Sequence, residues 1–260
     1  MTKKIKYYKE LIWELTKNEL KLRYSGSVLG FIWVFLKPFM TFAILFMVFS
    51  VFFGQHDPYY KFNLLIGLVL FYYFSEGTIQ LTDTLLKRAD IILKLNFPRF
   101  VVIVSSLLST FINFLASLSF FFVLVFLFSK TDHIFSMYGL LMFVIAVIFL
   151  SLLILGFGLF SSIIQVKLRD FQQIWSLFIQ LLMYSTPIIY PLTILPDKLQ
   201  KIILLNPLTI IIDFSRSQLL NMPLAVSLNS VIILAVFIIL LNVAGYYYFN
   251  NRIKIIAENI

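Results

Sequence analysis

Two long runs without a single charged residue, 100–128 and 137–164, most strongly constrain how this chain can fold. Each is long enough to cross the roughly 30 Å hydrocarbon core of a bilayer as one tilted helix. The chain of 260 residues is 61% hydrophobic and only 13% charged, which is too apolar for a soluble domain. We therefore expect an all-α integral membrane protein that crosses the bilayer several times.

The apolar pattern predicts a single transmembrane domain over residues 1–260. One apolar region, 191–223, is interrupted at Asn206 and Pro207, and neither part is long enough to cross the bilayer. Segments of that length predict short re-entrant or interfacial helices before the last span. Six spans are expected in all, over residues 30–53, 62–81, 100–128, 137–164, 174–190 and 228–249.

Residues 1–25 predict an amphipathic helix that lies in the membrane interface rather than crossing it. A solvated amphipathic leader is the alternative. Charged residues occupy the other faces of this helix. Its apolar residues recur at three-, four- and seven-residue spacings, which places them on one helical face: Ile5, Tyr8, Ile12, Leu15 and Leu22.

A polar stretch, 83–99, separates two apolar runs and carries four cations. Clustered cations in a short loop mark the cytoplasmic side of a membrane. Its apolar residues fall near helical spacing and Pro98 stops the run, so a short amphipathic helix is predicted over 84–97. This segment is either an ordinary charged loop or a docking surface for another subunit.

The distribution of cations predicts the orientation of the chain. Sixteen of the 21 Lys and Arg residues fall in segments that six spans would place on one side, and five fall on the other. The cation-rich side is the cytoplasm, so both termini are expected there. Because the net charge of +9 is explained in this way, we do not expect nucleic-acid binding.

The sequence offers little catalytic chemistry of its own. It has no cysteine, and neither His56 nor His133 has metal-ligand spacing around it. It also lacks a Gly-x-x-x-x-Gly-Lys loop, so we expect no cofactor on this chain and any nucleotide to be bound by a partner. Glu76 is the one acidic residue inside an apolar run, which makes it a functional candidate. Alternatively, it is hydrated near an interface or accepts hydrogen bonds from neighbours.

Aromatic residues make up 18% of the chain, with 30 Phe and 13 Tyr. Most of them must face lipid or pack between helices. Within a pore, however, an aromatic face would suit weak stacking against the CH faces of sugars. The candidate path residues are Phe35, Phe39, Phe42, Tyr72, Tyr73, Glu76 and Tyr184.

Five motifs in order along the chain resemble one family of transporters. They are RYSGSVLGFIWVFLKP at 23–38, KLNFPR at 94–99, KLRDF at 167–171, YSTPIIYP at 184–191 and NPL at 206–208. Together they resemble the membrane permease subunit of polysaccharide-exporting ABC transporters, which carry O-antigen, wall teichoic acid or capsular polysaccharide. The resemblance covers nearly the whole chain.

The resemblance implies a homodimer in the bacterial cytoplasmic (inner) membrane that moves a lipid-linked glycan. Two copies of a separate ATPase subunit would bind ATP and magnesium, and this chain would not be an enzyme. Residues 191–223 would gate the exit on the outer side, and 84–97 would be the coupling helix. Its expected ATPase-coupling residues are Leu85, Lys87, Arg88, Asp90, Lys94, Asn96 and Phe97.

In such an exporter, Arg23 and Lys37 would lie near the cytoplasmic mouth and could bind the pyrophosphate of a lipid carrier. Orientation and snorkelling explain the same two cations without a ligand. Three other functions stay open from the residues alone. They are an ABC permease for a drug, peptide or small lipid, an integral-membrane enzyme of lipid-linked sugar metabolism, and a secondary transporter.

Overall fold

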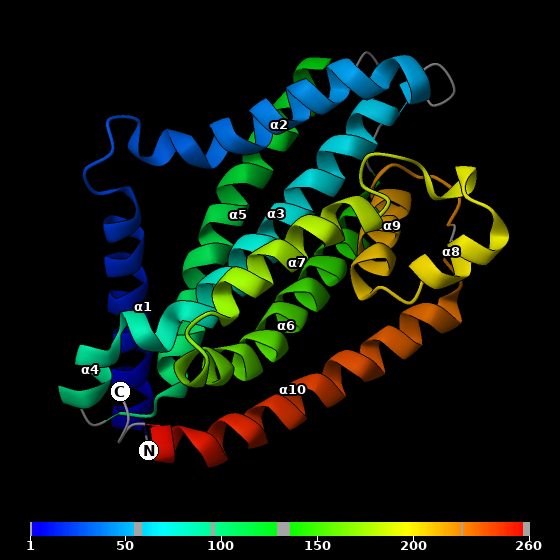
Figure 1. Ribbon diagram of the computed structural model, residues 1–260. Helices are drawn as coiled ribbons and strands as arrows, with labels where there is room; N and C mark the ends of the chain where they lie inside the picture. The colour runs from blue at the N-terminus through cyan, green and yellow to red at the C-terminus, as the bar shows by residue number, and fades with distance from the viewer. Residues whose placement is uncertain (1, 55–58, 95–96, 129–135, 225, 257–260) are drawn as a thin grey trace.

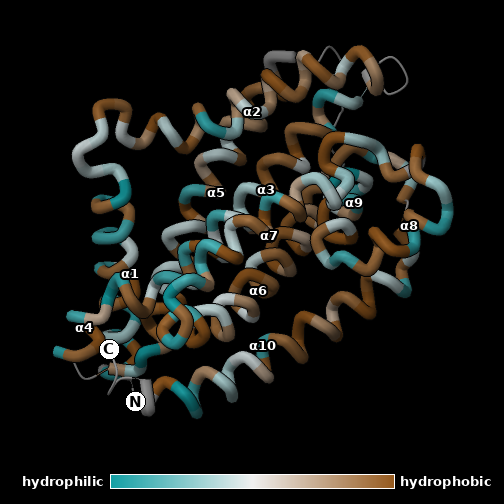
Figure 2. The backbone as a smooth tube through the Cα atoms, in the orientation of Figure 1, coloured by the Kyte–Doolittle hydropathy of each residue, from teal (hydrophilic) through white to brown (hydrophobic). Residues whose placement is uncertain are grey.

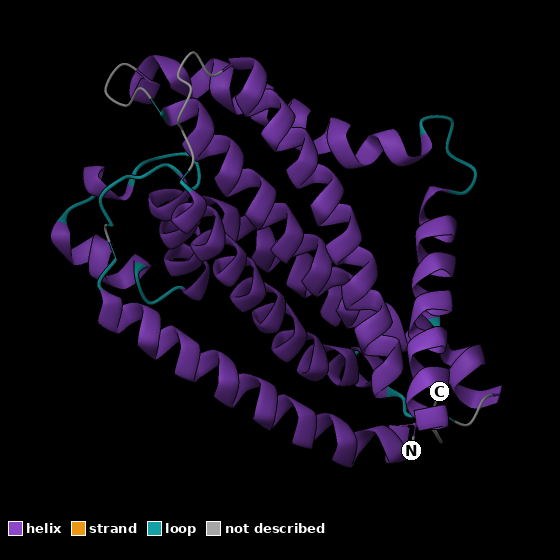
Figure 3. Ribbon diagram, turned by 180° about the vertical axis from the view of Figure 1, so that it is seen from behind, coloured by secondary structure: helices purple, strands orange, loops and turns teal. Residues whose placement is uncertain are grey.

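The computed structural model describes residues 2–54, 59–94, 97–128, 136–224 and 226–256, and throughout these ranges the chain is helix and loop without strands (Figure 3). This confirms the predicted all-α class. The helices are α1 Thr2–Tyr24, η1 Gly30–Ile32, α2 Trp33–Phe49, the π-helical segment η2 Ser50–Gly54, α3 Tyr60–Lys87, α4 Ala89–Lys94, α5 Phe100–Phe128, α6 Met137–Lys167, α7 Phe171–Ser185, η3 Leu192–Ile194, α8 Asp197–Ile203, α9 Pro207–Leu219 and α10 Leu228–Ile256.

Helix α3 forms the centre of the bundle. Its most apolar window is 78% buried, and it packs against α5, α6, α7 and α9. The corresponding windows of α2 and α10 are 6% and 17% buried, so these two helices lie at the periphery (Figure 1). Both carry hydrophobic residues along most of their length (Figure 2). Such faces fit a membrane, where lipid replaces water as the neighbour.

Five helices in the described ranges are long and apolar enough to cross a membrane. They begin at Gly30, Tyr60, Phe100, Met137 and Leu228. The pair α8 and α9 would make a sixth only if it counts as one broken span, because its two halves meet at 102°. The chain is therefore a multi-pass membrane protein.

The predicted span 174–190 differs most from the structure. Helix α7 covers Phe171–Ser185, only 15 residues, which is too short to cross the full hydrocarbon core. It ends because Thr186 precedes Pro187 and adopts extended backbone angles, as the residue before a proline prefers. The prediction was wrong because it rested on hydropathy, which does not distinguish this helix from the apolar loop that follows it.

The predicted span 62–81 also has different bounds, since α3 continues to Lys87. The charges at its end were expected to lie in a loop. Instead Asp83 and Lys87 form an i,i+4 ion pair of 2.9 Å on the helix surface, which helical geometry favours. The segment 84–97 is consequently not one helix. Its first residues finish α3, and α4 is a separate helix of six residues.

The segments predicted to be cytoplasmic share one end of the bundle. Helices α1 and α4 and the last turns of α10 gather there, whereas α8 and α9 lie at the opposite end (Figure 1). Helix α1 packs against α5 through Leu15 and Thr16, both of which are buried. At the outer ends of the predicted apolar face, Ile5 and Leu22 are exposed.

Arg216 on α9 holds the opposite end together. Its guanidinium donates hydrogen bonds to the backbone carbonyls of Asn63, Pro187 and Ile188, at 2.9, 2.6 and 2.8 Å. One arginine therefore joins α9 to α3 and to the loop after α7. Helix α9 itself begins at Pro207, and the Asn206 side chain caps it by accepting from the Leu208 amide at 3.0 Å. The short bent helices expected in 191–223 form in this way.

A close approach of α6 to α9 depends on Gly139. A Cβ at this position would lie 2.2 Å from the backbone oxygen of Gln218, which cannot move without shifting α9. We expect Gly139→Ala to destabilise the fold by about 1–3 kcal/mol through overpacking. Thermal unfolding in detergent should show this loss. Val144→Ala, at a lipid-facing position on the same helix, should stay within about 0.5 kcal/mol of wild type. Equal thermal unfolding midpoints for the two variants would contradict the close contact between Gly139 and α9.

Candidate functional site

A cavity of about 400 Å³ lies where α1 passes into α2 and faces α3 and α5. It brings together five residues that the sequence singled out separately. They are Arg23, Lys37, Tyr72, Tyr73 and Glu76. The chain changes direction beside this cavity at Ser25–Leu29, where the turn glycine Gly26 has a φ of 80°, a conformation that glycine adopts most readily.

The two charged candidates Arg23 and Glu76 are partners. The Arg23 guanidinium donates to the Glu76 carboxylate, and the side chains are 21% and 45% exposed. Asn113 also donates to Glu76, at 3.4 Å. Burial lowers the pKa of Arg23 from its ordinary value. Glu76 is therefore neither alone nor deeply buried, and Arg23 already has a counter-ion.

Lys37 differs from Arg23 because no carboxylate pairs with it among the described residues. Its ammonium lies 5.6 Å from the centre of the Tyr72 ring, a cation–π contact. The Tyr72 hydroxyl in turn shares a 2.7 Å hydrogen bond with Thr41. Since Lys87 also lines the cavity, three cations face it against one carboxylate.

Apolar groups make up much of the remaining wall of the cavity, including Trp33, Pro38, Val69 and Phe114. A concave site with apolar walls and a few convergent polar groups is the usual form of a small-ligand site. The surplus of cations favours a negatively charged ligand, and the apolar walls favour a ligand with hydrocarbon or ring faces. The cavity is thus chemically suited to the anionic head of an amphiphile.

The aromatic path candidates are not gathered in one place. Tyr73 borders the cavity, but its ring stacks on Phe114 at 4.5 Å and its hydroxyl bonds Ser151 at 2.8 Å, which joins α3 to α5 and α6. Four others lie away from the cavity: Phe35 and Phe39 against Phe120, Phe42 against Phe46, and Tyr184 on α7 with 68% of its surface exposed.

The predicted ATPase-coupling residues fall into two groups. Leu85 and Phe97 are buried, and the Arg88 side chain is only 11% exposed, so these three face inward. Lys87, Asp90 and Lys94 are exposed at the surface, together with Leu93. Asn96 lies outside the described residues. A docking partner could therefore touch only the second group directly.

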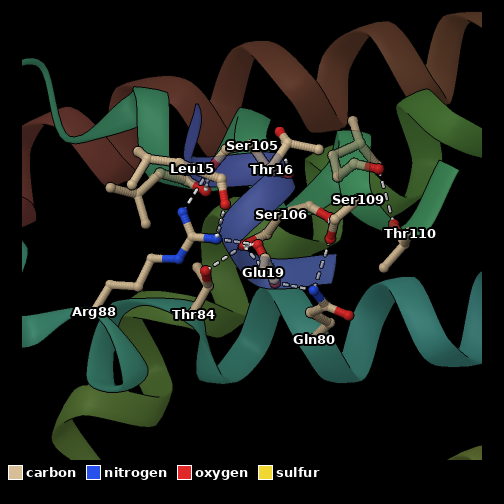
Figure 4. A network of polar contacts seen from close by, with 12 residues as sticks. Leu15, Thr16, Glu19, Gln80, Thr84, Arg88, Ser105, Ser106, Ser109 and Thr110 are labelled. Atoms are coloured by element: carbon tan, nitrogen blue, oxygen red, sulfur yellow. Dashed lines mark hydrogen bonds and ion pairs between the residues drawn. The ribbon is translucent and has the colours of Figure 1, made fainter. Parts of the chain in front are cut away.

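Sequence reasoning missed Glu19, which lies at the centre of a buried polar network (Figure 4). Its carboxylate accepts from Arg88 and Gln80, and from the Ser106 hydroxyl at 3.1 Å. Burial raises the pKa of the Glu19 carboxyl, and the neighbouring Arg88 guanidinium opposes that shift. The sequence did indicate that Glu19 is unusual. It follows Leu15 by four residues, so this charged residue falls on the apolar face of α1.

Comparison with known proteins identifies the class of this fold. Residues 10–220 match the family model described as the ABC-2 type transporter membrane family, and the chain belongs to that family. Among its relatives are two O-antigen export system permease proteins, RfbA. The one from Klebsiella pneumoniae is 27% identical over 94% of this chain and 93% of its own length, and the one from Myxococcus xanthus is 29% identical over 80% and 79%. The polysialic acid transport protein KpsM of Escherichia coli is 23% identical over 78% of each chain.

The two ion pairs that join α1 to residues outside it should differ in their effect on stability. Glu19→Gln leaves the Arg88 charge without its partner in a site where both side chains are at most 16% exposed, and we expect a loss of about 3–5 kcal/mol. Glu76→Gln should cost at most about 1 kcal/mol, because that pair is partly hydrated. Denaturant unfolding in detergent micelles measures both. A loss for Glu76→Gln as large as that for Glu19→Gln would contradict this assignment of burial.

Proposed function

We propose that this chain is the membrane permease subunit of an ATP-driven exporter that moves a lipid-linked polysaccharide across the bacterial cytoplasmic membrane. The similarity to the Klebsiella pneumoniae O-antigen export permease supports this most, because it extends over 94% of this chain and 93% of that relative. The function resides in the helical bundle as a whole.

A separate subunit supplies the energy. The sequence has no phosphate-binding loop, so ATP and magnesium belong to a partner ATPase, and this chain performs no hydrolysis. Two ATPase copies serve a homodimer of permease subunits. The exposed residues Lys87, Asp90, Leu93 and Lys94 at the start and along the side of α4 are the docking surface. Helices α1 and α4 and both termini then lie on the cytoplasmic side, in agreement with the excess of cations there.

The cation-rich cavity receives the anionic head of the lipid carrier. Lys37 is the more available cation, because the carboxylate of Glu76 already neutralises Arg23. Arg23 binds phosphate oxygens only when it exchanges Glu76 for the ligand. Arginine can donate two parallel charge-assisted hydrogen bonds to a phosphate, which favours this exchange. The apolar wall accommodates the first isoprene units of the carrier.

Depletion of this chain in its native cell tests the cargo. Lipid-linked glycan should accumulate in the cytoplasmic leaflet and disappear from the cell surface, as measured with a glycan probe that cannot cross the inner membrane. Restored expression of the chain should reverse both changes. Unchanged glycan distribution would leave the family assignment intact and would show that the cargo is another molecule.

Replacement of the two cations tests the head-group site. We expect Lys37→Gln to lower the export rate about tenfold, because a hydrogen bond to a charged group contributes about 1.5–3 kcal/mol. Arg23→Gln combined with Lys37→Gln should lower it further. Export is measured per folded protein in proteoliposomes that contain the ATPase subunit. Lys6→Gln, whose side chain is 80% exposed on α1, is the matched control. Full export by the double variant would exclude a role for these cations in phosphate binding.

A further inference from the structure

The docking helix α4 is not a rigid extension of α3. Helix α3 ends at Lys87, and Arg88 has φ −115° and ψ 20°, outside the helical range. Helix α4 begins at the next residue and contains six residues. Because the backbone bends at this one position, α3 alone cannot carry a displacement of α4 into the bundle.

The side chain at this joint contacts two other helices. The Arg88 guanidinium donates to the Glu19 carboxylate and to the Leu15 carbonyl on α1, the latter at 3.2 Å. It also donates to the Ser105 hydroxyl on α5 at 2.7 Å. Figure 4 shows the three acceptors converging on the guanidinium. The residue that interrupts α3 therefore ties the joint to α1 and α5.

Glu19 extends the link back into the bundle. Its carboxylate accepts from Gln80, which lies two turns before the end of α3, and from Ser106 on α5. The Gln80 side-chain amide also donates to the Ser109 hydroxyl on α5, at 2.9 Å. On the α1 side, the Thr16 hydroxyl donates to the Ser105 carbonyl at 3.2 Å. Every one of these contacts joins different helices, so the network acts as a fastening between α1, α3 and α5.

Burial makes this link stiff. The Glu19 and Arg88 side chains are 16% and 11% exposed, and separating them would leave two poorly solvated charges. The planar guanidinium also bonds its acceptors in a fixed fork, which limits pivoting. The pair of Lys17 and Glu14 on the same helix has side chains that are 52% and 68% exposed, so water can replace its partners much more readily. A displacement of the joint therefore carries α1 and α5 with it.

We propose that the Glu19–Arg88 pair is the link that passes motion of the docking helix α4 to α1 and α5. This inference rests on the proposed function, in which the ATPase subunit binds the exposed face of α4. Neighbouring residues then have separate tasks. The exposed side chains of Asp90, Leu93 and Lys94 bind the ATPase subunit, and the buried Arg88 side chain transmits the motion. Arg88 is a positioning residue, and α1 is a moving part of the transporter.

The doubly neutral variant Glu19→Gln with Arg88→Gln tests the link, because it removes both charges together. It is reconstituted with the ATPase subunit, and ATP hydrolysis and glycan movement are measured in the same proteoliposomes. We expect assembly and ATP hydrolysis to persist, since the docking face is intact, while glycan moved per ATP falls about tenfold, within the range of site-to-site coupling. Glu14→Gln should keep the wild-type ratio. A wild-type ratio in the doubly neutral variant would overturn the proposal.

A covalent replacement keeps the test decisive if the neutral variant does not fold. The chain has no native cysteine, so Glu19→Cys with Arg88→Cys can be bridged by a short bismaleimide, and both positions border a cavity of about 370 Å³ that admits the reagent. Bridging should restore glycan movement per ATP to near the wild-type ratio. A bridged, folded protein that hydrolyses ATP at the wild-type rate without moving glycan would also overturn the proposal.

The two proposals fail in different ways. If wild-type protein with its ATPase moves no glycan, the proposed cargo is wrong. The link is then tested by movement of α1 itself, measured as the separation of spin labels at Lys6→Cys on α1 and Lys167→Cys on α6. This separation should change on addition of ATP when Glu19 and Arg88 are intact and should not change in the doubly neutral background. An equal change in both backgrounds would exclude the link independently of the cargo.

Discussion

A backbone amide in hydrocarbon has no water to bond, and this constraint governs the whole chain. It requires helices wherever the apolar runs cross the bilayer, and it allows loops only at the two ends of the bundle. The non-helical backbone around Pro187 shows how an exception is tolerated. Arg216 satisfies the carbonyls of Pro187 and Ile188, so the interruption after α7 is held by a side chain in place of a helical turn.

The polar interior is concentrated near the end of the bundle that carries α1 and α4. There the Glu19–Arg88 pair and the Arg23–Glu76 pair join α1 to the central helix α3. The pairs differ in burial, and this difference separates their roles. The more buried pair is the one we propose to fix helices relative to one another, whereas the more exposed pair borders the proposed head-group cavity. One amphipathic helix would thus contribute to both the proposed binding site and the joint beside the proposed docking surface.

Much of the architecture was predictable, because long uncharged runs and the distribution of cations depend on local composition. The ends of the helices were less predictable where two sequence rules gave different answers. Asp83 and Lys87 were read as loop charges, but helical spacing lets them pair at the surface of α3. The position of Pro187, which holds Thr186 in an extended conformation, determines where α7 ends, whereas hydropathy would extend the helix further. Five site residues were selected one by one, yet nothing in the pattern indicated that they share one cavity.

The sequence by itself determined the helical class, five of the predicted membrane-crossing segments and the absence of a phosphate loop, since each depends on residues adjacent in the chain. Only the tertiary structure decided which charges are partners. Glu19 and Arg88 lie 69 positions apart. Glu19 falls among the apolar residues of α1, and Arg88 is the residue between α3 and α4. They come into contact only when α1 packs beside the end of α3, and the low exposure of both side chains makes removal of one partner costly, because burial is a property of the packed helices and not of either segment alone.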